Sequence, residues 1–287
     1  MFTALFVFLW LCEVNALVRS TSQRHRPFLP KTCLNTATLR IEKDEVSVGT
    51  ALCQILEEEY HKTISEKGTF VFGISGGSML KMLSHLKGHS KIDWSLCTMA
   101  FVSHRCVALD DDAATYYKAR PLFLQTWMDQ GLHVLTTTGT MDAEREADAY
   151  ESLLAALPTR VLPHSVEGYP IFDLLMIGVG TDGHVGSIYP HLDDVHSKRV
   201  VVPVMAPANK PVKISLSLKT MTTAKSQVIA CAGKSTKAPL GKAEAMVRAL
   251  ESEGETAMSF PASVFRDHAT FLIDEDSAVL LKSKKVP

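Results

Sequence analysis

The sequence lacks the features of several large functional classes. Its 30 lysines and arginines are balanced by 31 aspartates and glutamates, so no overall field attracts nucleic acid or an anionic membrane. None of the six cysteines forms a Cys-x-x-Cys pair, and their spacings fit no zinc ligand set. Beyond the N-terminal region there is no repeat, low-complexity tract or linker. The sequence therefore predicts one folded domain with scattered reduced thiols, no metal, no nucleic-acid partner and no membrane contact of the mature form.

Both common nucleotide-binding fingerprints are also missing, namely Gly-x-x-x-x-Gly-Lys-Ser/Thr and Gly-x-Gly-x-x-Gly. The chain has instead Ser75-Gly76-Gly77-Ser78, after an apolar run at 69–74 and before apolar residues at helical spacing. A strand, a Ser/Gly loop and a helix present backbone N–H groups and hydroxyls to an anion. The loop predicts a site for a sugar phosphate rather than a dinucleotide. A plain strand-to-helix turn is the alternative at this stage.

A second glycine-rich segment follows the apolar run at 171–177. The residues Gly178-Val179-Gly180-Thr181-Asp182-Gly183 come next, and then His184. Glycines after a buried strand let the backbone turn sharply and leave room for a ligand, and ligands of open α/β sheets lie at strand ends. We therefore expect a titratable imidazole beside a carboxylate at the mouth of a site. The alternative is a glycine-rich turn with an incidental surface histidine.

Helical and strand patterns alternate along the rest of the chain. The alternation predicts an α/β fold, with a single mainly parallel, doubly wound sheet and helices on both faces. The helix predicted at 121–130 has Pro121 in its first turn. The predicted helices cover 46–60, the residues after Ser78, 121–130, 141–157 and 238–251. The predicted strands cover 69–74, 96–102, 134–136, 171–177, 200–204, 212–218, 227–231 and 270–273.

The N-terminal region differs from the rest. Residues 5–11 are apolar but too few to span a bilayer, and small residues at 14–16 resemble a signal cleavage point. Residues 17–39 have no acidic side chain and carry several arginines and serines, as transit peptides do. We expect a signal-plus-transit leader at 1–41 that directs a domain at 42–287 to a plastid. There are two alternatives: a simple secretory signal for the endoplasmic reticulum, and a disordered extension on a cytoplasmic protein.

Together the segments resemble the 6-phosphogluconolactonase family and, more loosely, the glucosamine-6-phosphate deaminases/isomerases. The run Ser187-Ile188-Tyr189-Pro190 is similar to the Ser-Leu-Phe-Pro-like run of the lactonases, whereas the deaminases carry a Phe-Asn-Glu-Pro-like run. The resemblance covers roughly 46–281. The other segments that carry it are 75–78, 110–120, 178–190, 213–218, 232–238 and 260–263.

The resemblance implies hydrolysis of a sugar-phosphate lactone, 6-phospho-D-glucono-1,5-lactone, without metal or redox cofactor. It implies His184 as general base, because imidazole titrates near neutral pH. It implies that Asp182 either orients this imidazole or lines the site, and that Arg105 faces the lactone or its developing charge. The residues implied for phosphate binding are Ser75, Gly76, Gly77, Ser78, Lys213 and Lys237.

The chain departs from the family pattern in one important place. The family's Asp-Glu-Arg is here Ser103-His104-Arg105, and lysine at 213 replaces arginine, which removes a bidentate fork. Three functions stay open: an active lactonase, weakened by these changes; a non-catalytic sugar-phosphate binder; and a deaminase/isomerase, which lacks its acidic residue near position 103. We expect that Ser103→Asp with His104→Glu raises activity without harming stability. Oligomeric state and the exact sugar stay open.

Overall fold

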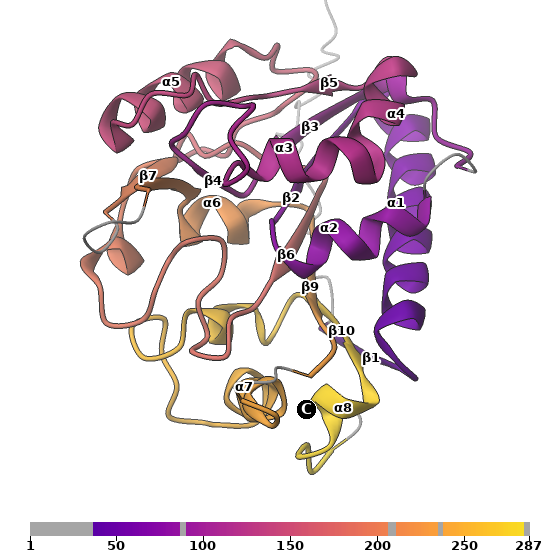
Figure 1. The fold of residues 1–287 in the computed structure, drawn as a ribbon, viewed down its shortest axis with the longest axis vertical. Helices are drawn as coiled ribbons and strands as arrows, with labels where there is room; N and C mark the ends of the chain where they lie inside the picture. The colour runs from indigo at the N-terminus through magenta and orange to yellow at the C-terminus, as the bar shows by residue number, and fades with distance from the viewer. Residues whose placement is uncertain (1–36, 87–89, 206–210, 235–237, 284–287) are drawn as a thin grey trace, which may run out of the picture. The chain divides into compact units, whose positions relative to one another are not determined.

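A computed structural model describes residues 37–86, 90–205, 211–234 and 238–283 (Figure 1). Its main sheet has seven strands, all parallel, in the order β1-β10-β9-β6-β2-β3-β5. This confirms the predicted doubly wound α/β fold. The strands are β1 Thr38–Glu42, β2 Phe70–Ile74, β3 Cys97–Phe101, β5 His133–Val134, β6 Leu174–Gly178, β9 Ser226–Cys231 and β10 Thr270–Asp274.

Helices cover both faces of this sheet because its strands are apolar on both sides. In β2, Phe70 and Phe72 pack in the core under α1, α2 and α4, while Val71 packs in the core under α5 and α7. Figure 1 shows α1 and α2 on the side of the sheet away from α5. The helices are α1 Glu45–Lys67, α2 Ser78–Leu83, α3 Thr115–Ala119, α4 Gln125–Asp129, α5 Ala143–Ala156, α6 Leu218–Thr223, α7 Gly241–Leu250 and α8 Glu275–Ala278.

A second, antiparallel sheet of three strands was not predicted. It consists of β4 Ser103–Arg105, β8 Lys213–Leu216 and β7 Val201–Val204, in the order β4-β8-β7. The sequence predicted strands near β7 and β8, but β4 has three residues, too few for an alternating pattern. Its pairing with β8 joins segments more than 100 residues apart, which no local pattern reveals.

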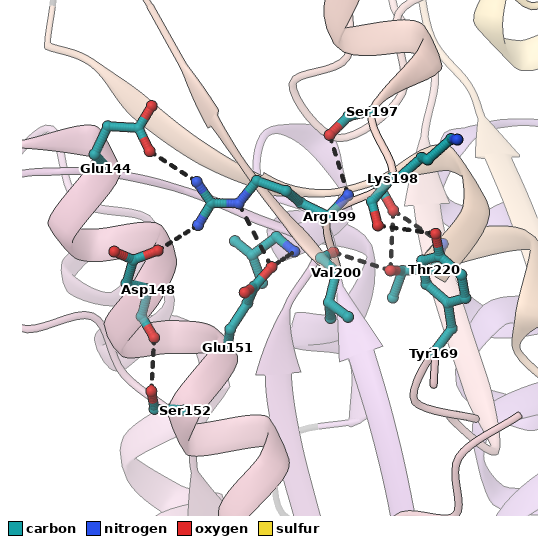
Figure 2. Close-up of polar contacts among 12 residues, drawn as sticks. Glu144, Asp148, Glu151, Ser152, Tyr169, Ser197, Lys198, Arg199, Val200 and Thr220 are labelled. Atoms are coloured by element: carbon teal, nitrogen blue, oxygen red, sulfur yellow. Dashed lines mark hydrogen bonds and ion pairs between the residues drawn. The ribbon is translucent and has the colours of Figure 1, made fainter. Parts of the chain in front are cut away.

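Arg199, just before β7, ties this small sheet to α5 (Figure 2). Its guanidinium contacts Glu144 at 2.7 Å, and also Asp148 and Glu151, all on one face of α5. Glu151 also accepts a hydrogen bond from the backbone N–H of Val201 at 2.8 Å. The small sheet is therefore held by packing and by one arginine shared among three carboxylates.

Two boundaries differ from those predicted. The expected boundary between leader and domain, after Ile41, falls inside β1, which pairs with β10 from Thr38 to Glu42. The domain therefore includes at least residues 38–41. The mixed polar and apolar residues of this edge strand, with Arg40 among them, do not stand out from the basic segment before it. Residues 1–36 of the expected leader lie outside the described residues.

The helix predicted at 121–130, with Pro121 in its first turn, begins earlier. It starts with α3 at Thr115 and continues through a π-helical turn, Arg120–Leu124, into α4. Proline has no N–H to donate and crowds the preceding turn, and the wider π turn accommodates it inside a helical run. The prediction treated the proline as a start signal and was wrong by about two turns.

The described cysteines, Cys53, Cys97, Cys106 and Cys231, are buried free thiols, as predicted. Cys12 and Cys33 lie outside the described residues. Among the helices of the described ranges, none has the length and apolar character needed to cross a membrane.

Candidate functional site

The candidate site is a pocket of about 260 Å³ at the carboxyl ends of β2 and β6. These neighbouring strands mark the switch point of the sheet, because the chain continues to β3 and β5 on one side of β2 and to β9 and β10 on the other. Ligands of open α/β sheets bind at such a point. The pocket has two walls: a loop wall, residues 75–78 and 178–189, and a sheet wall, the strands β4 and β8.

The first part of the loop wall contains a buried hydroxyl that has no partner. The backbone N–H of Ser75 donates to Met176 at 2.9 Å, which fixes the start of the loop against β6. The Oγ of Ser75 is buried and has no hydrogen-bond partner among the described residues. Gly77, just before α2, has φ of 71°, which disfavours any other residue. The other residues of the loop, Gly76, Gly77 and Ser78, line the pocket with Ser75.

The second part of the loop wall holds His184 against Asp182. Their Nδ1 and Oδ1 atoms lie 2.6 Å apart, and the backbone N–H of His184 donates to the same oxygen at 3.2 Å. This hydrogen bond keeps the pKa of the Asp182 carboxyl below its usual value. An Nδ1–H that donates to a carboxylate leaves Nε2 as the basic nitrogen. Of the two proposed roles for Asp182, contact with the imidazole is the one seen, since His184 lines the pocket and Asp182 does not.

The turn that carries His184 requires glycine at positions 180 and 183. A Cβ on Gly180 would lie 2.1 Å from Nδ1 of His184 and 2.6 Å from Oδ1 of Asp182, so any side chain there displaces the pair. Gly183 has φ of 86°, and a Cβ there would lie 2.4 Å from the ring of Phe260. The N–H of Ala262 donates to the Gly183 carbonyl at 3.0 Å. The segment 260–263, singled out by its sequence, therefore supports the histidine turn from behind.

The sheet wall places two cations side by side. Arg105 on β4 is the register partner of Lys213 on β8, so both side chains leave the same face of the small sheet. Arg105 donates to the carbonyl of Ala113 at 3.3 Å. Neither cation forms an ion pair with a carboxylate within the described ranges. The wall therefore presents positive charge to the pocket.

Tyr189 joins the two walls. Its ring lies against His184, with the ring centroids 4.7 Å apart, and its hydroxyl accepts a hydrogen bond from Nζ of Lys213 at 2.8 Å. In the sequence this tyrosine is only one member of a motif, and no role was predicted for it. The replacement of the family's phenylalanine by tyrosine was the signal that could have identified it.

His104 is a buried support of the sheet wall. Its Nε2 accepts from the backbone N–H of Tyr116 at 3.2 Å, so Nδ1 carries the hydrogen and donates to the Arg105 carbonyl at 2.7 Å. The hydroxyl of Thr137 lies 3.3 Å from Nδ1 of His104. Burial lowers the pKa of His104, which favours the neutral ring that this pattern requires. The side chain links β4 to the first turn of α3.

The structure brings most of the predicted residues to one pocket. Lys237 lies outside the described residues, and its role stays a prediction. Thr115 and Ser103, which had no predicted role, also line the pocket. No group of three or more histidine, cysteine, aspartate or glutamate side chains suited to a metal ion occurs in the ranges described. The predicted residues that line the pocket are Ser75, Gly76, Gly77, Ser78, Arg105, His184 and Lys213.

Comparisons with known proteins show the family and the fold of the chain. Residues 43–273 match the family described as Glucosamine-6-phosphate isomerases/6-phosphogluconolactonase. The chain is 26% identical to a 6-phosphogluconolactonase of Homo sapiens over 82% of its length and 90% of that protein's. It is 30% identical to the chloroplastic 6-phosphogluconolactonase 3 of Arabidopsis thaliana, over 76% of its own length and 67% of that protein's. A crystal structure of 6-phosphogluconolactonase from Leishmania guyanensis has the same fold, with a TM-score of 0.71, 20% identity, and coverage of 86% and 99% of the two chains.

Proposed function

Because the chain belongs to the family of glucosamine-6-phosphate isomerases and 6-phosphogluconolactonases, we propose that it is a 6-phosphogluconolactonase. It hydrolyses 6-phospho-D-glucono-1,5-lactone to 6-phosphogluconate, a step of the oxidative pentose phosphate pathway. The human and Arabidopsis relatives are named for this activity. The observation that carries the proposal is the imidazole–carboxylate pair of His184 and Asp182, 2.6 Å apart, at a pocket that also holds two cations.

His184 acts as the general base in this mechanism. Its Nε2 takes a proton from a water molecule while the water oxygen forms a bond to the lactone carbonyl carbon. Asp182 accepts from Nδ1–H, so it keeps the imidazole in the required tautomer and stabilises the imidazolium that forms. The imidazolium then returns its proton to the ring oxygen as the bond from the carbonyl carbon to that oxygen breaks.

Arg105 stabilises the charge that develops on the carbonyl oxygen. Its guanidinium stays protonated throughout the reaction and lines the same pocket as His184. The hydrogen bond to the Ala113 carbonyl holds one of its nitrogens and leaves other N–H groups free for the substrate. Each step therefore has a group of the chain at the pocket that can carry it.

The phosphate group of the substrate lies against residues 75–78 in this proposal. The backbone N–H groups of Gly76, Gly77 and Ser78 and the exposed Ser78 hydroxyl are the donors, and Lys213 supplies positive charge. Lys237 remains proposed as a further counter-charge on the family resemblance. A net charge of −1 for the whole chain makes such a local cluster necessary for binding an anion.

The test is hydrolysis of freshly generated lactone by the purified protein, measured against the spontaneous rate. A catalysed rate that His184→Gln removes, while 6-phosphogluconate still binds, supports the lactonase. Binding of the sugar phosphate without any catalysed rate would instead identify the non-catalytic binder. That second function is favoured by Ser103 and His104, which stand where the family has two carboxylates.

Delivery to a plastid stays part of the proposal. An Arabidopsis relative is named as chloroplastic, and residues 1–36 of the expected leader lie outside the described part of the chain. A reporter fused to residues 1–37 should enter the secretory route and reach the plastid only when Arg19, Arg24 and Arg26 are present. Cytosolic fluorescence from the intact leader would contradict this.

A further inference from the structure

We propose that Tyr189 is a specificity-determining residue whose hydroxyl, together with Lys213, binds the phosphate group of the substrate. The inference rests on the proposed function and adds a ligand to it, because the phenylalanine found here in the lactonase pattern has no hydroxyl. It follows from three observations: the direction of one hydrogen bond, the arrangement of charge on the sheet wall, and the place of the tyrosine in the pocket.

The hydrogen bond fixes what the hydroxyl can still do. An ammonium group only donates, so the Tyr189 oxygen accepts from Lys213 in their 2.8 Å contact. The hydrogen of the hydroxyl therefore points elsewhere, and within the described residues it has no acceptor. Lys213 keeps two further N–H donors. The pair thus offers three adjacent donors and no strong acceptor, which suits an oxyanion.

The charge around Tyr189 and Lys213 also favours an anionic ligand. Lys213 faces Arg105 across the β4–β8 ladder, and like charges directly opposite each other destabilise a sheet. No carboxylate of the described residues pairs with either cation. A bound dianion relieves this repulsion, whereas a neutral sugar hydroxyl does not. The phosphate is the group of the substrate that carries such charge.

The Tyr189 side chain spans the space between the proposed base and the sheet wall. The ring lies against His184, the proposed base, and its hydroxyl extends to the sheet wall at Lys213. Tyr189 and Lys213 both line the pocket. A ligand held at this hydroxyl therefore lies toward the sheet wall, while the ring of the same residue lies against the proposed base. The Tyr189 ring also covers one side of His184, and Tyr189→Phe keeps this ring contact.

Tyr189→Phe is the test, because it removes the hydroxyl and keeps the ring. The probes are 6-phosphogluconate and gluconate, with affinity measured by calorimetry, and the phosphorylated and unphosphorylated lactones, with KM and kcat measured separately. Loss of a hydrogen bond to a charged group predicts 6-phosphogluconate binding weaker by about 10- to 100-fold and a similar rise in KM for the phosphorylated lactone. Binding of gluconate and turnover of the unphosphorylated lactone should not change.

Tyr169→Phe is the matched control. Tyr169 also has a lysine over its ring, Lys219 at 5.9 Å, but its hydroxyl donates to the Lys198 carbonyl outside the pocket. Removal of that hydroxyl should leave both affinities unchanged. A general effect of losing a tyrosine hydroxyl beside a lysine would appear in both variants.

Two results would overturn the inference. One is 6-phosphogluconate affinity of Tyr189→Phe within about twofold of the parent. The other is an equal loss for phosphorylated and unphosphorylated ligands, which would assign the hydroxyl to the lactone end. Because 6-phosphogluconate binding needs no turnover, a parent protein that binds it but hydrolyses nothing would refute the proposed function alone.

Discussion

The two walls of the pocket are built in different ways. The loop wall consists of two continuous segments, each placed directly after a buried strand of the parallel sheet. The sheet wall consists of two short strands whose register partners, Arg105 and Lys213, are more than 100 residues apart. One wall is therefore local in sequence, whereas the other exists only after folding.

The walls also differ in how far they depart from the family pattern. The loop wall keeps the glycines, the serines and the pair of His184 and Asp182. The sheet wall has Ser103 and His104 where the family has carboxylates, and lysine where it has arginine at 213. Tyr189, which reaches from one wall to the other, is changed in parallel. This comparison indicates that the proposed base and the proposed phosphate loop have been kept, while the sheet wall and Tyr189 have changed.

The largest expected effect is on the loop wall. His184→Ala should lower kcat by about 10²- to 10⁴-fold, because it removes the proposed general base. His61→Ala, at an exposed position of α1, is the control and should match the parent. Rates on freshly generated lactone, corrected for spontaneous hydrolysis, measure this. A His184→Ala variant within a few-fold of the parent would remove the histidine from the mechanism.

Gly180→Ala tests whether the loop wall needs its geometry as much as its histidine. The added Cβ would lie 2.1 Å from Nδ1 of His184, so the imidazole must move. Displacement of a catalytic group by about 1 Å costs on the order of 10²-fold in rate. Gly254→Ala, where a Cβ meets nothing within 4 Å, should leave kcat unchanged. An unaffected Gly180→Ala enzyme would mean that the pair tolerates a different arrangement.

On the sheet wall, His104→Glu should affect stability. The expectation that Ser103→Asp with His104→Glu leaves stability unharmed conflicts with the structure, because the His104 ring is buried and bonded through both nitrogens. A carboxylate cannot donate to the Arg105 carbonyl, and an unsatisfied buried group costs about 1–3 kcal/mol. Thermal unfolding should show a Tm several degrees lower for His104→Glu and almost unchanged for Ser103→Asp alone. Equal Tm values for the two variants would contradict this.

The pH dependence of stability provides a finer test of the same side chain. Burial lowers the pKa of His104 below its unfolded value of about 6.5, so the unfolded state takes up a proton first as pH falls. The free energy of unfolding should therefore decrease as pH falls below about 6.5, toward the lower folded pKa. Arg105 opposes protonation of His104 and Glu146 favours it, and these are the charged groups near the ring.

His104→Gln should flatten this dependence, because its amide can donate and accept in the same directions without titrating. Chemical unfolding at a series of pH values from about 7.5 to 5.5 measures it. His268, whose pKa burial also lowers, accounts for part of the slope, so His268→Gln is the companion variant. A slope that His104→Gln leaves unchanged would mean that His104 is not the titrating group.

The smallest effect is expected at Arg199, which does not line the pocket and whose contacts with α5 are drawn in Figure 2. Its three carboxylate partners are partly exposed, and such ion pairs contribute about 0–1 kcal/mol each. Arg199→Ala should lower stability slightly, more at low salt than at high salt, and leave KM unchanged. A large rise in KM would show that the sheet wall depends on this distant contact to α5.

The amino-acid sequence by itself determined the fold class, the main strands and the loop wall. Apolar runs and the glycines that follow them are local signals, because backbone freedom and strand burial act within a few residues. For this reason the sequence alone is enough to predict residues 75–78 and the pair of His184 and Asp182 as parts of a site.

Only the tertiary structure decided the sheet wall, the buried role of His104 and the contact between Tyr189 and Lys213. These depend on the register of β4 against β8 and on the packing of that sheet against its neighbours. The sequence shows that a tyrosine and a lysine are present, but hydrogen bonds between segments distant in the chain form only where folding places their atoms within about 3 Å.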